Sequence, residues 1–533
     1  MTTSPISRAI GCVAALLMAG IAAAGPGDRI QRHPPVVCTG CRNDDLYPAA
    51  ATDAAGNSII VWVKYDATDF PDFGLWARWF GPDGHPRGEQ FRIFLPQTSF
   101  EGYPDAPSVA MRPDGAFVVT WIWRDTLGTP TFVRARMFGS DGAPRSGVIT
   151  VSSADRDTHP FPSVAMDSDG DFVVVWASGA RTSENSIVWA RTYDSIGTPK
   201  GLAFSVDPTG PSPRRRIPDV AMDAAGNFVV VWWQFDVANE RMAVFGRRYG
   251  AAGVARGDRF PVSTTGVTGD PGVPAVAMAD GGSFAVAFDR SLTEPNSNTV
   301  WLGIFGRRFD ASGAPLGGEF RASAFGRAAY RGEVDIDMDN DGDFVVAWIA
   351  QDAVNDSTNL HARLYAASGT PLMRDRSYGF GHVGPRNEKV AMDAVGNFVA
   401  TWVHYSEDPN DTGFGPNIFV QHFAGPDDAR PGCSGFIAGI VGTVGNDSLQ
   451  GTSGDDVIQG LDGNDILKGG GGADIICGGP GDDQIFGESG RDHLLGGPGD
   501  DVLDGGGDKD LCNGNRQTNA DTALDCETVL QVP

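Results

Sequence analysis

Two repeating patterns of apolar and polar positions organise this chain, and the longer one occupies residues 25–430. Each unit has a core of the form P-S-V-A-M-D-x-x-G-x-F-V-V-x-W, in which an apolar run follows a glycine turn. The turn glycines stand 54 to 60 residues apart, and a large aromatic residue follows each after six positions. The glycines are Gly56, Gly115, Gly170, Gly226, Gly282, Gly342 and Gly396, and the aromatics are Trp62, Trp121, Trp176, Trp232, Phe288, Trp348 and Trp402.

A second signature follows a variable polar segment in each unit. It reads Ala135-Arg136-Met137-Phe138 in one unit and Gly306-Arg307-Arg308-Phe309 in another, and a glycine turn and a short strand come after it. β-Branched and aromatic residues dominate without helical periodicity, which predicts four strands per unit. Seven such units predict a seven-bladed β-propeller.

The two ends of the array favour a closed ring. The seventh unit supplies three strands, and the segment Gly27-Asp28-Arg29-Ile30 matches Gly257-Asp258-Arg259-Phe260, where a fourth strand begins in another unit. We expect the N-terminal segment to complete the last blade, which leaves no unpaired edge. An open β-solenoid is the alternative, although nothing in it requires this circular permutation.

The shorter pattern has a period of nine residues and runs from Gly442 to Asn513 in eight copies. Each nonad opens with glycine, carries aspartate at its sixth position and nearly always has an aliphatic residue at its eighth; a second glycine recurs at the fourth position from Gly445 to Gly499. Glycine at the first and fourth positions permits positive φ, so six residues can turn and three can form a strand. The inward residues expected at the strand centres are Leu449, Ile458, Leu467, Ile476, Ile485, Leu494 and Leu503.

Stacked nonads would bring their aspartates into rows. Like charges in a row repel unless a cation lies between them, and calcium suits this role because it accepts several carboxylate and carbonyl oxygens in loose geometry. The acidic residues are Asp447, Asp456, Asp465, Asp474, Asp483, Asp492, Asp501 and Asp510.

These nonads resemble the repeats-in-toxin (RTX, hemolysin-type) family of bacterial secreted calcium-binding proteins, whose pattern is G-G-x-G-x-D-x-U-x. The resemblance implies a parallel β-roll that binds several Ca²⁺ ions, with the eight aspartates as side-chain ligands. The second position departs from glycine at Thr443, Thr452, Leu461 and Glu488, so we expect affinity to vary along the stack. A disordered glycine-rich linker is the alternative, and the strict aliphatic position argues against it.

Residues 1–24 are typical of a secretory signal peptide. Arg8 precedes an apolar run from Ala9 to Ala23, and Ala22-Ala23-Ala24 forms a small-residue cleavage site. A retained membrane anchor is the alternative, but the run is short for a span and no other stretch could cross a bilayer. We therefore expect an extracellular protein with no transmembrane segment after cleavage. The general secretory route is favoured over type I export, and association with the cell surface stays open.

Six cysteines remain after the signal peptide, an even number that suits an exported protein. Cys512 takes the inward position of the last nonad, so a bridge to Cys526 would close the end of the roll. Cys433 and Cys477 are the next expected pair. Cys38-Thr39-Gly40-Cys41 favours a disulfide over a redox or zinc site.

The charge supports a cation-loaded roll. The chain has a formal net charge of −26, and residues 442–513 hold 15 acidic and 3 basic side chains, a net −12. Such acidity argues against nucleic acid as a partner.

Three features of the propeller region leave alternatives open. The Asp-x-x-Gly turns, such as Asp53 to Gly56, are expected to be hairpin turns rather than metal sites. Asp337-Met338-Asp339-Asn340-Asp341-Gly342 has the spacing of a calcium loop but lacks the glutamate of an EF-hand. Repeated arginines indicate a structural role rather than an anion-binding ring like that of sialidases; they are Arg78, Arg136, Arg191, Arg248, Arg308 and Arg363.

The sequence thus predicts an all-β protein with a signal peptide (1–24), a propeller (25–430) and an RTX β-roll with a disulfide-closed cap (431–533). G-x-S-x-G, H-E-x-x-H and G-x-x-x-x-G-K motifs are absent, and no catalytic residue is assigned. We expect the propeller to bind an extracellular glycan or surface protein through variable segments such as Tyr65 to Leu75 and Gln234 to Arg241. The alternative is an extracellular polysaccharide lyase or hydrolase with its active site on the propeller.

Overall fold

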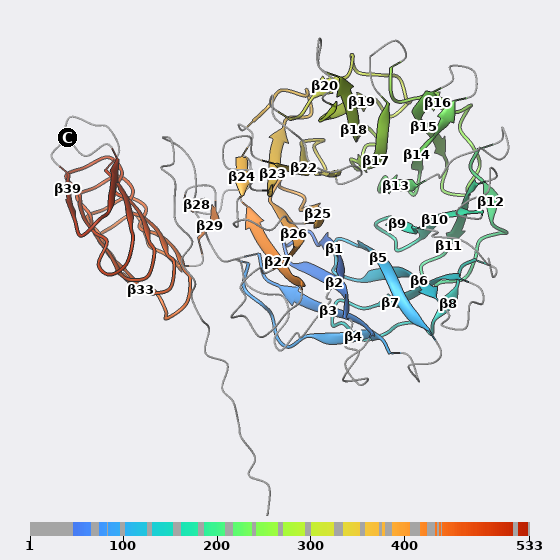
Figure 1. The fold of residues 1–533 in the computed structure, drawn as a ribbon. Coiled ribbons are helices and arrows are strands. Elements are labelled where there is room, and N and C mark those ends of the chain that lie inside the picture. The colour runs from blue at the N-terminus through green and yellow to red at the C-terminus, as the bar shows by residue number, and fades with distance from the viewer. Residues whose placement is uncertain are drawn as a thin grey trace, which may run out of the picture.

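The computed structural model is all-β and consists of a ring of sheets beside a narrow roll (Figure 1). In the residues that the structure describes, no helix is long and apolar enough to span a membrane. Residues 1–45 and 531–533 lie outside them, and so do the expected signal peptide, the Cys38–Cys41 pair and Gly27–Ile30. Description runs from residue 46 to 530 except for 65–73, 83, 96–101, 125–130, 153–160, 180–185, 208–216, 237–240, 265–269, 294–299, 324–333, 352–357, 373–375, 379–385, 406–415, 424–431, 434–435, 439 and 515–520.

Seven antiparallel sheets form the ring, which confirms the seven-bladed propeller. The first strands of successive blades lie side by side around the axis. The first four blades are β1 (Leu46–Thr52), β2 (Ser58–Lys64), β3 (Gly74–Phe80) and β4 (Phe91–Phe94); β5 (Tyr103–Met111), β6 (Phe117–Arg124), β7 (Phe132–Phe138) and β8 (Ile149–Thr150); β9 (Ser163–Met166), β10 (Phe172–Ser178), β11 (Ile187–Tyr193) and β12 (Phe204–Ser205); and β13 (Pro218–Met222), β14 (Phe228–Asp236), β15 (Arg241–Tyr249) and β16 (Phe260–Pro261). The last three are β17 (Pro271–Met278), β18 (Phe284–Thr293), β19 (Val300–Phe309) and β20 (Phe320–Arg321); β21 (Val334–Met338), β22 (Phe344–Gln351), β23 (Thr358–Tyr365) and β24 (Arg376–Tyr378); and β25 (Arg386–Met392), β26 (Phe398–Tyr405) and β27 (Pro416–Phe423).

The repeated aromatics explain why the blades pack. The aromatic six residues after each turn glycine lies on the second strand and is buried in every blade. A second aromatic pair stacks across the second and third strands, as Phe228 does with Tyr249 at a centroid distance of 5.0 Å. Such pairs bury large apolar area in a fixed geometry, so each blade offers a rigid face to the next.

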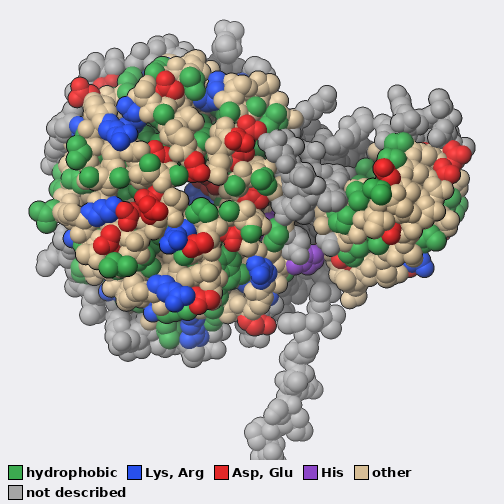
Figure 2. All heavy atoms as spheres, turned by 180° about the vertical axis from the view of Figure 1, so that it is seen from behind, with side chains coloured by type: hydrophobic (Ala, Val, Ile, Leu, Met, Phe, Trp, Pro, Cys, Tyr) green, Lys and Arg blue, Asp and Glu red, His purple; other side chains and the backbone are tan. Residues whose placement is uncertain are grey.

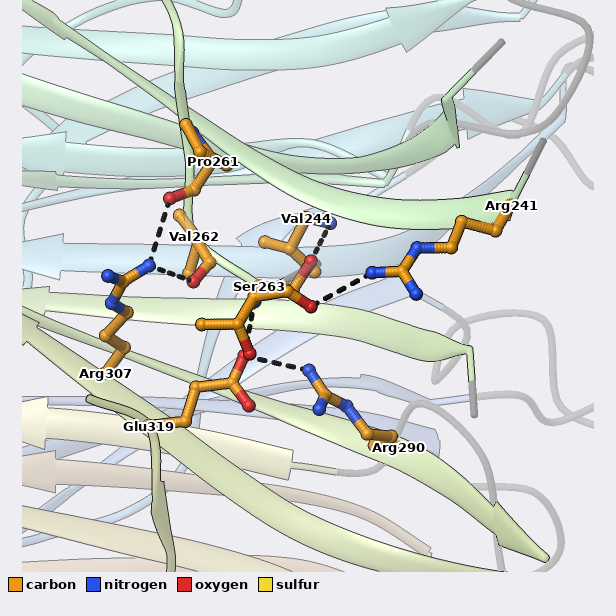
Figure 3. Close-up of polar contacts among 9 residues, drawn as sticks. Arg241, Val244, Pro261, Val262, Ser263, Arg290, Arg307 and Glu319 are labelled. Atoms are coloured by element: carbon orange, nitrogen blue, oxygen red, sulfur yellow. Dashed lines mark hydrogen bonds and ion pairs between the residues drawn. The ribbon is translucent and has the colours of Figure 1, made fainter. Parts of the chain in front are cut away.

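The repeated arginines hold neighbouring blades together. Arg307 Nη1 donates to the carbonyl oxygens of Pro261 and Val262 in the preceding blade, at 3.4 and 3.1 Å (Figure 3). The same contact recurs from Arg136, Arg191, Arg247 and Arg363. The structural role is thus confirmed, but the sequence register was wrong in two blades.

Arg247 and Arg307 hold the equivalent positions in those blades, rather than Arg248 and Arg308. Arg248 and Arg308 point the other way, and each donates from Nη1 to a carbonyl of the following blade, Ala311 and Ala367. The doubled arginine in these two blades concealed the register, because neighbouring residues of a strand face opposite sides of the sheet.

The ring closes between the first and seventh blades. Thr52 Oγ1 donates to the Met392 carbonyl oxygen at 2.6 Å, and Ser58 Oγ lies 2.8 Å from His422 Nε2. Ile60 and Trp62 share a hydrophobic cluster with Val399 of β26. The seventh sheet has three strands in the described part of the chain, and the proposed fourth strand at Gly27–Ile30 stays a prediction.

The C-terminal roll is a parallel β-solenoid of about five turns, as the nonads predicted. A short hairpin of β28 (Gly432–Cys433) and β29 (Phe436–Ile437) precedes it. One sheet comprises β30 (Ile440–Val441), β32 (Val457–Gln459), β34 (Ile475–Cys477), β36 (His493–Leu495), β38 (Leu511–Asn513) and β40 (Thr528–Leu530). The other comprises β31 (Ser448–Gln450), β33 (Ile466–Gly471), β35 (Gln484–Ser489), β37 (Val502–Asp504) and β39 (Thr522–Leu524).

The predicted aliphatic residues form the core of the roll. All of them from Ile458 to Leu503 are fully buried, and Cys512 is buried in the same column. Leu449, in the first nonad, is partly buried. The Cys512–Cys526 disulfide is present, with a Cα–Cα distance of 6.1 Å. Cys477 is also disulfide-bonded, and its pairing with Cys433 stays a prediction.

Glycine is required at the first position of each nonad, but the predicted reason, a positive φ, was wrong. In the described roll, positive φ occurs at the second and fourth positions, as at Gly479 and Gly481, and not at the first. A Cβ on Gly478 would instead lie 2.1 Å from Asp483 Oδ2 and 2.7 Å from the Gly496 carbonyl oxygen. The first position requires glycine because oxygen atoms fill the space beside it.

Candidate metal centre

The sixth-position aspartates form rows, as predicted, and the rows are two in number. Successive nonads alternate between the two sheets, so each aspartate stacks on the one 18 residues away. The amide of Asp465 donates to Asp483 Oδ1 at 2.8 Å, and the amide of Asp474 donates to Asp492 Oδ1 at 2.8 Å. The rows are Asp447, Asp465, Asp483 and Asp501, and Asp456, Asp474, Asp492 and Asp510.

Each row continues beyond the nonads, an extension that the nine-residue pattern did not predict. The amide of Asp501 donates to Asp521 Oδ1 at 3.1 Å, and the amide of Asp510 donates to Glu527 Oε2 at 2.7 Å. The expected cap is therefore itself a further turn of the roll, built from β39 and β40. Residues 514–520 interrupt the nine-residue spacing, so the pattern does not extend to this turn. The sequence feature that could have identified it is an acidic residue followed by a short apolar strand, at Asp521 and again at Glu527.

Six of the eight aspartates carry a carboxylate oxygen that is buried and has no hydrogen-bond partner. In each case this atom is Oδ2, while Oδ1 accepts the amide of the row. A buried carboxylate oxygen without a donor is costly, so the chemistry of each of these atoms suits contact with a cation. The six are Asp465, Asp474, Asp483, Asp492, Asp501 and Asp510.

In five of the six nonads, a backbone carbonyl oxygen lies beside the bare Oδ2. The point where a Cβ on Gly469 would lie is 2.2 Å from Asp474 Oδ2 and 2.7 Å from the Gly487 carbonyl oxygen. Among described side chains, no group of three or more His, Cys, Asp and Glu could hold a metal alone. A metal here would therefore depend on backbone carbonyls, which is the mixed oxygen set that calcium accepts.

Burial raises the pKa of these carboxyl groups. The pKa of Asp474, Asp483 and Asp510 rises to about 7, mainly because burial disfavours the charged form and partly because acidic neighbours repel it. The same cause raises the pKa of Asp492 and Asp501 to about 6. The row amides oppose these shifts without cancelling them. The rows thus hold more negative charge than their own donors stabilise.

Asp447 and Asp456, which head the two rows, are satisfied differently. Asp447 Oδ2 accepts the amide and hydroxyl of Thr443 at 2.5 and 2.9 Å. Asp456 Oδ2 accepts the same pair of donors from Thr452 at 2.6 and 2.9 Å. The predicted ligand set therefore falls into two groups with different surroundings.

Aspartate carboxylates at the turns of the propeller accept hydrogen bonds from backbone amides. The hairpin interpretation of the Asp-x-x-Gly turns is confirmed, since Asp53 Oδ1 accepts the amides of Ala55 and Asn57 and Gly56 has a φ of 78°. In the D-x-D-x-D-G segment, Asp337 Oδ2 accepts the Met392 amide of the next blade, whereas Asp339 Oδ1 accepts two amides of its own turn. These two carboxylates thus serve different backbones and do not form a calcium loop.

Polar residues near the propeller axis also join blades. Asp219 accepts hydrogen bonds from Ser163 Oγ at 2.6 Å and from the Val276 amide at 2.8 Å, so it links three blades. Lys389 Nζ lies 3.1 Å from Asp335 Oδ1. Figure 2, which shows the ring from behind, has acidic and basic side chains interspersed around the small central opening.

Comparison with known families identifies the roll. Residues 441–476 and 478–512 match the family model described as the RTX calcium-binding nonapeptide repeat (4 copies). No curated protein matches the chain.

Several solved structures resemble the ring at low identity. An α-L-arabinanase of Penicillium chrysogenum is 12% identical, with a TM-score of 0.42 over 73% of this chain and 98% of its own. An α-L-arabinofuranosidase of Fusarium graminearum is 11% identical, with a TM-score of 0.41 over 60% and 92%. The NanB sialidase of Streptococcus pneumoniae is 8% identical, with a TM-score of 0.41 over 73% and 70%. Nothing about the chemistry of this chain follows from likenesses of this degree.

Proposed function

Because this chain carries RTX calcium-binding nonapeptide repeats after a seven-bladed propeller, we propose that it is a secreted calcium-binding protein whose roll folds when calcium binds. The observation that carries the proposal is the set of six buried carboxylate oxygens that lack a donor. The sixth-position aspartates would be the side-chain ligands, together with carbonyl oxygens of the turns. Bound calcium would offset the repulsion within each row and supply folding free energy.

Secretion fits this chemistry. An unfolded acidic roll would pass through an export channel, and calcium outside the cell would then order it. RTX repeats are characteristic of secreted proteins, and residues 1–24 have the pattern expected of a signal peptide.

Calcium binding to the full-length protein tests the proposal. Isothermal titration should show several bound ions, with a gain of β signal in circular dichroism. Asp483→Asn should weaken both, because it removes a charge from the middle of a row. Asp504→Asn is the matched control, since it removes a charge from the outer face of β37. Absence of calcium binding by the wild-type protein would contradict the proposal.

We further propose that the propeller is an extracellular binding or adhesion module. The support is that its described polar residues join blades, as Asp219 and Arg307 do, which leaves ligand recognition to the variable segments. Of the segments Tyr65 to Leu75 and Gln234 to Arg241, which were expected to bind a glycan or surface protein, residues 65–73 and 237–240 lie outside the described residues. Retention of the full-length protein on immobilised glycans would support this role. Release of reducing ends from those glycans would instead favour the enzyme alternative.

A further inference from the structure

The residue at the second position of each nonad divides the roll into two kinds of turn. In the first two nonads it is Thr443 or Thr452, and neither has positive φ. In the other six it has a φ between 72° and 122°, even where the residue is Leu461 or Glu488. Those six residues are Leu461, Gly470, Gly479, Glu488, Gly497 and Gly506.

The two kinds of turn coincide with the two states of the aspartate. Where the second residue has positive φ, Oδ2 of the same nonad is buried and bare in all six cases. Where it is threonine, Oδ2 accepts both an amide and a hydroxyl from that threonine. Backbone conformation at one position therefore decides whether the carboxylate receives donors from its own turn.

Side-chain branching explains the difference. A residue that is branched at Cβ meets severe steric cost at positive φ, whereas an unbranched residue pays about 1–2 kcal/mol and glycine nearly nothing. Threonine thus keeps ordinary φ, which turns its amide toward the aspartate, and its hydroxyl adds a second donor. Leucine and glutamate accept the strain and leave Oδ2 open.

We propose that Thr443 and Thr452 replace calcium at the heads of the two rows, so that calcium binds only from the third nonad onward. The positive ends of an N–H and an O–H bond already point at Oδ2 of Asp447 and Asp456, and they would repel a cation at the same place. The first turn becomes a metal-free cap on which the calcium-bound turns stack. This inference rests on the proposed calcium-dependent folding and narrows the ligand set from eight aspartates to six.

The metal-free first turn lies where it could serve as a template for folding of the turns that follow it. Val457 of the second nonad and Ile475 share a hydrophobic cluster with Trp402 and Phe423 of the seventh blade. The propeller side of the molecule therefore supports one side of the roll, and that side includes the capped second nonad. A solenoid needs such a terminal repeat, because its first turn has a neighbour on one side only.

Counting bound ions in the full-length protein tests the inference. Equilibrium dialysis with ⁴⁵Ca²⁺ should give the same number for Asp456→Asn as for the wild type, and a lower number for Asp474→Asn in the same row. Thr452→Gly should bind one more ion, because glycine at this position can take the left-handed conformation. A loss in Asp456→Asn equal to that in Asp474→Asn would overturn the inference while calcium binding itself stands.

Amide exchange in the calcium-free wild-type protein provides a second measurement that needs no variant. Residues 442–459 should exchange more slowly than residues 469–513, since Asp447 and Asp456 have donors without metal. Equal exchange in both segments would count against the cap. A wild-type protein that binds no calcium would refute the proposed function and the inference together.

Discussion

At the residue scale, a buried arginine is paired with a carboxylate of its own blade, and that carboxylate also binds the preceding blade. Arg290 Nη2 lies 2.8 Å from Glu319 Oε1, and their side chains are 1% and 8% exposed (Figure 3). Glu319 also accepts the Thr264 amide at 2.6 Å, and the Arg290 guanidinium lies over the rings of Phe288 and Phe305. The ion pair therefore lies within the fifth blade, and the bond from Thr264 links its carboxylate to the fourth blade.

Loss of Glu319 should destabilise the propeller strongly. We expect Glu319→Ala to lower the free energy of unfolding by about 3–5 kcal/mol, because it leaves a buried arginine uncompensated. Glu89 lies just before the fourth strand of the first blade and is exposed, so Glu89→Ala should change the free energy of unfolding by no more than about 0.5 kcal/mol. Urea unfolding followed by tryptophan fluorescence measures both, and equal effects would show that the pair contributes little.

A second buried acid should make propeller stability depend on pH. Burial raises the pKa of Asp337 to about 7 from 3.8, the amides of Met392 and Met338 oppose this, and the charges of Asp335 and Asp219 add to it. The folded state thus holds the proton more tightly than the unfolded state. The protonated Asp337 carboxyl therefore contributes its full stabilisation below pH 3.8, and this contribution is lost as the pH rises through about 7.

The melting temperature of the propeller should therefore fall between pH 5 and pH 8 in saturating calcium. Asp337→Asn should reduce that fall and leave a smaller part from Asp339, whose pKa burial raises to about 6. Melting curves of the two proteins across this range provide the measurement. An unchanged pH slope in Asp337→Asn would assign the dependence to other groups.

At the scale of strands and turns, local patterns identified every blade and the core of the roll. Aliphatic residues at the eighth position are buried because strand alternation alone decides which way they point. The arginine register and the two rows of aspartates were harder, since they depend on which strand lies alongside. The sequence repeats every nine residues, but the residues that contact each other are 18 residues apart, as Asp465 and Asp483 are. No local pattern in the sequence carries that information.

Second-position threonines were noticed in the sequence only as departures from glycine. Their consequence requires the conformation of the turn, because Thr443 acts through its amide as well as its hydroxyl. No sequence pattern indicated that the first glycine of each nonad is needed because a Cβ would clash with oxygen atoms, rather than because φ is positive. Both features come from contacts between backbone atoms.

The thin core of the roll should make calcium affinity sensitive to single apolar contacts. Ile485 is fully buried, so Ile485→Ala should cost about 2–5 kcal/mol. Because binding and folding are coupled, the calcium concentration at half-maximal β signal should rise. Ile466 lies on the adjacent strand of the same sheet and is 37% exposed, which makes Ile466→Ala the matched control. An unchanged midpoint in Ile485→Ala would mean that the roll is folded before calcium binds.

At the scale of the whole molecule, the ring and the roll differ in how much apolar core they have. The propeller closes through Thr52 and Met392 and buries an aromatic residue in every blade. In contrast, the roll has a single column of apolar residues between two rows of buried carboxylates. The hydrophobic cluster that includes Trp402 and Val457 connects the two parts.

Hydrogen–deuterium exchange of the full-length protein with and without calcium tests this account most directly. We predict that peptides from residues 460–513 exchange rapidly without calcium and slowly with it, while peptides from β2, β6 and β14 remain protected in both conditions. Asp483→Asn should weaken the calcium-dependent protection. Equal protection of residues 460–513 in both conditions would contradict the claim that calcium folds the roll.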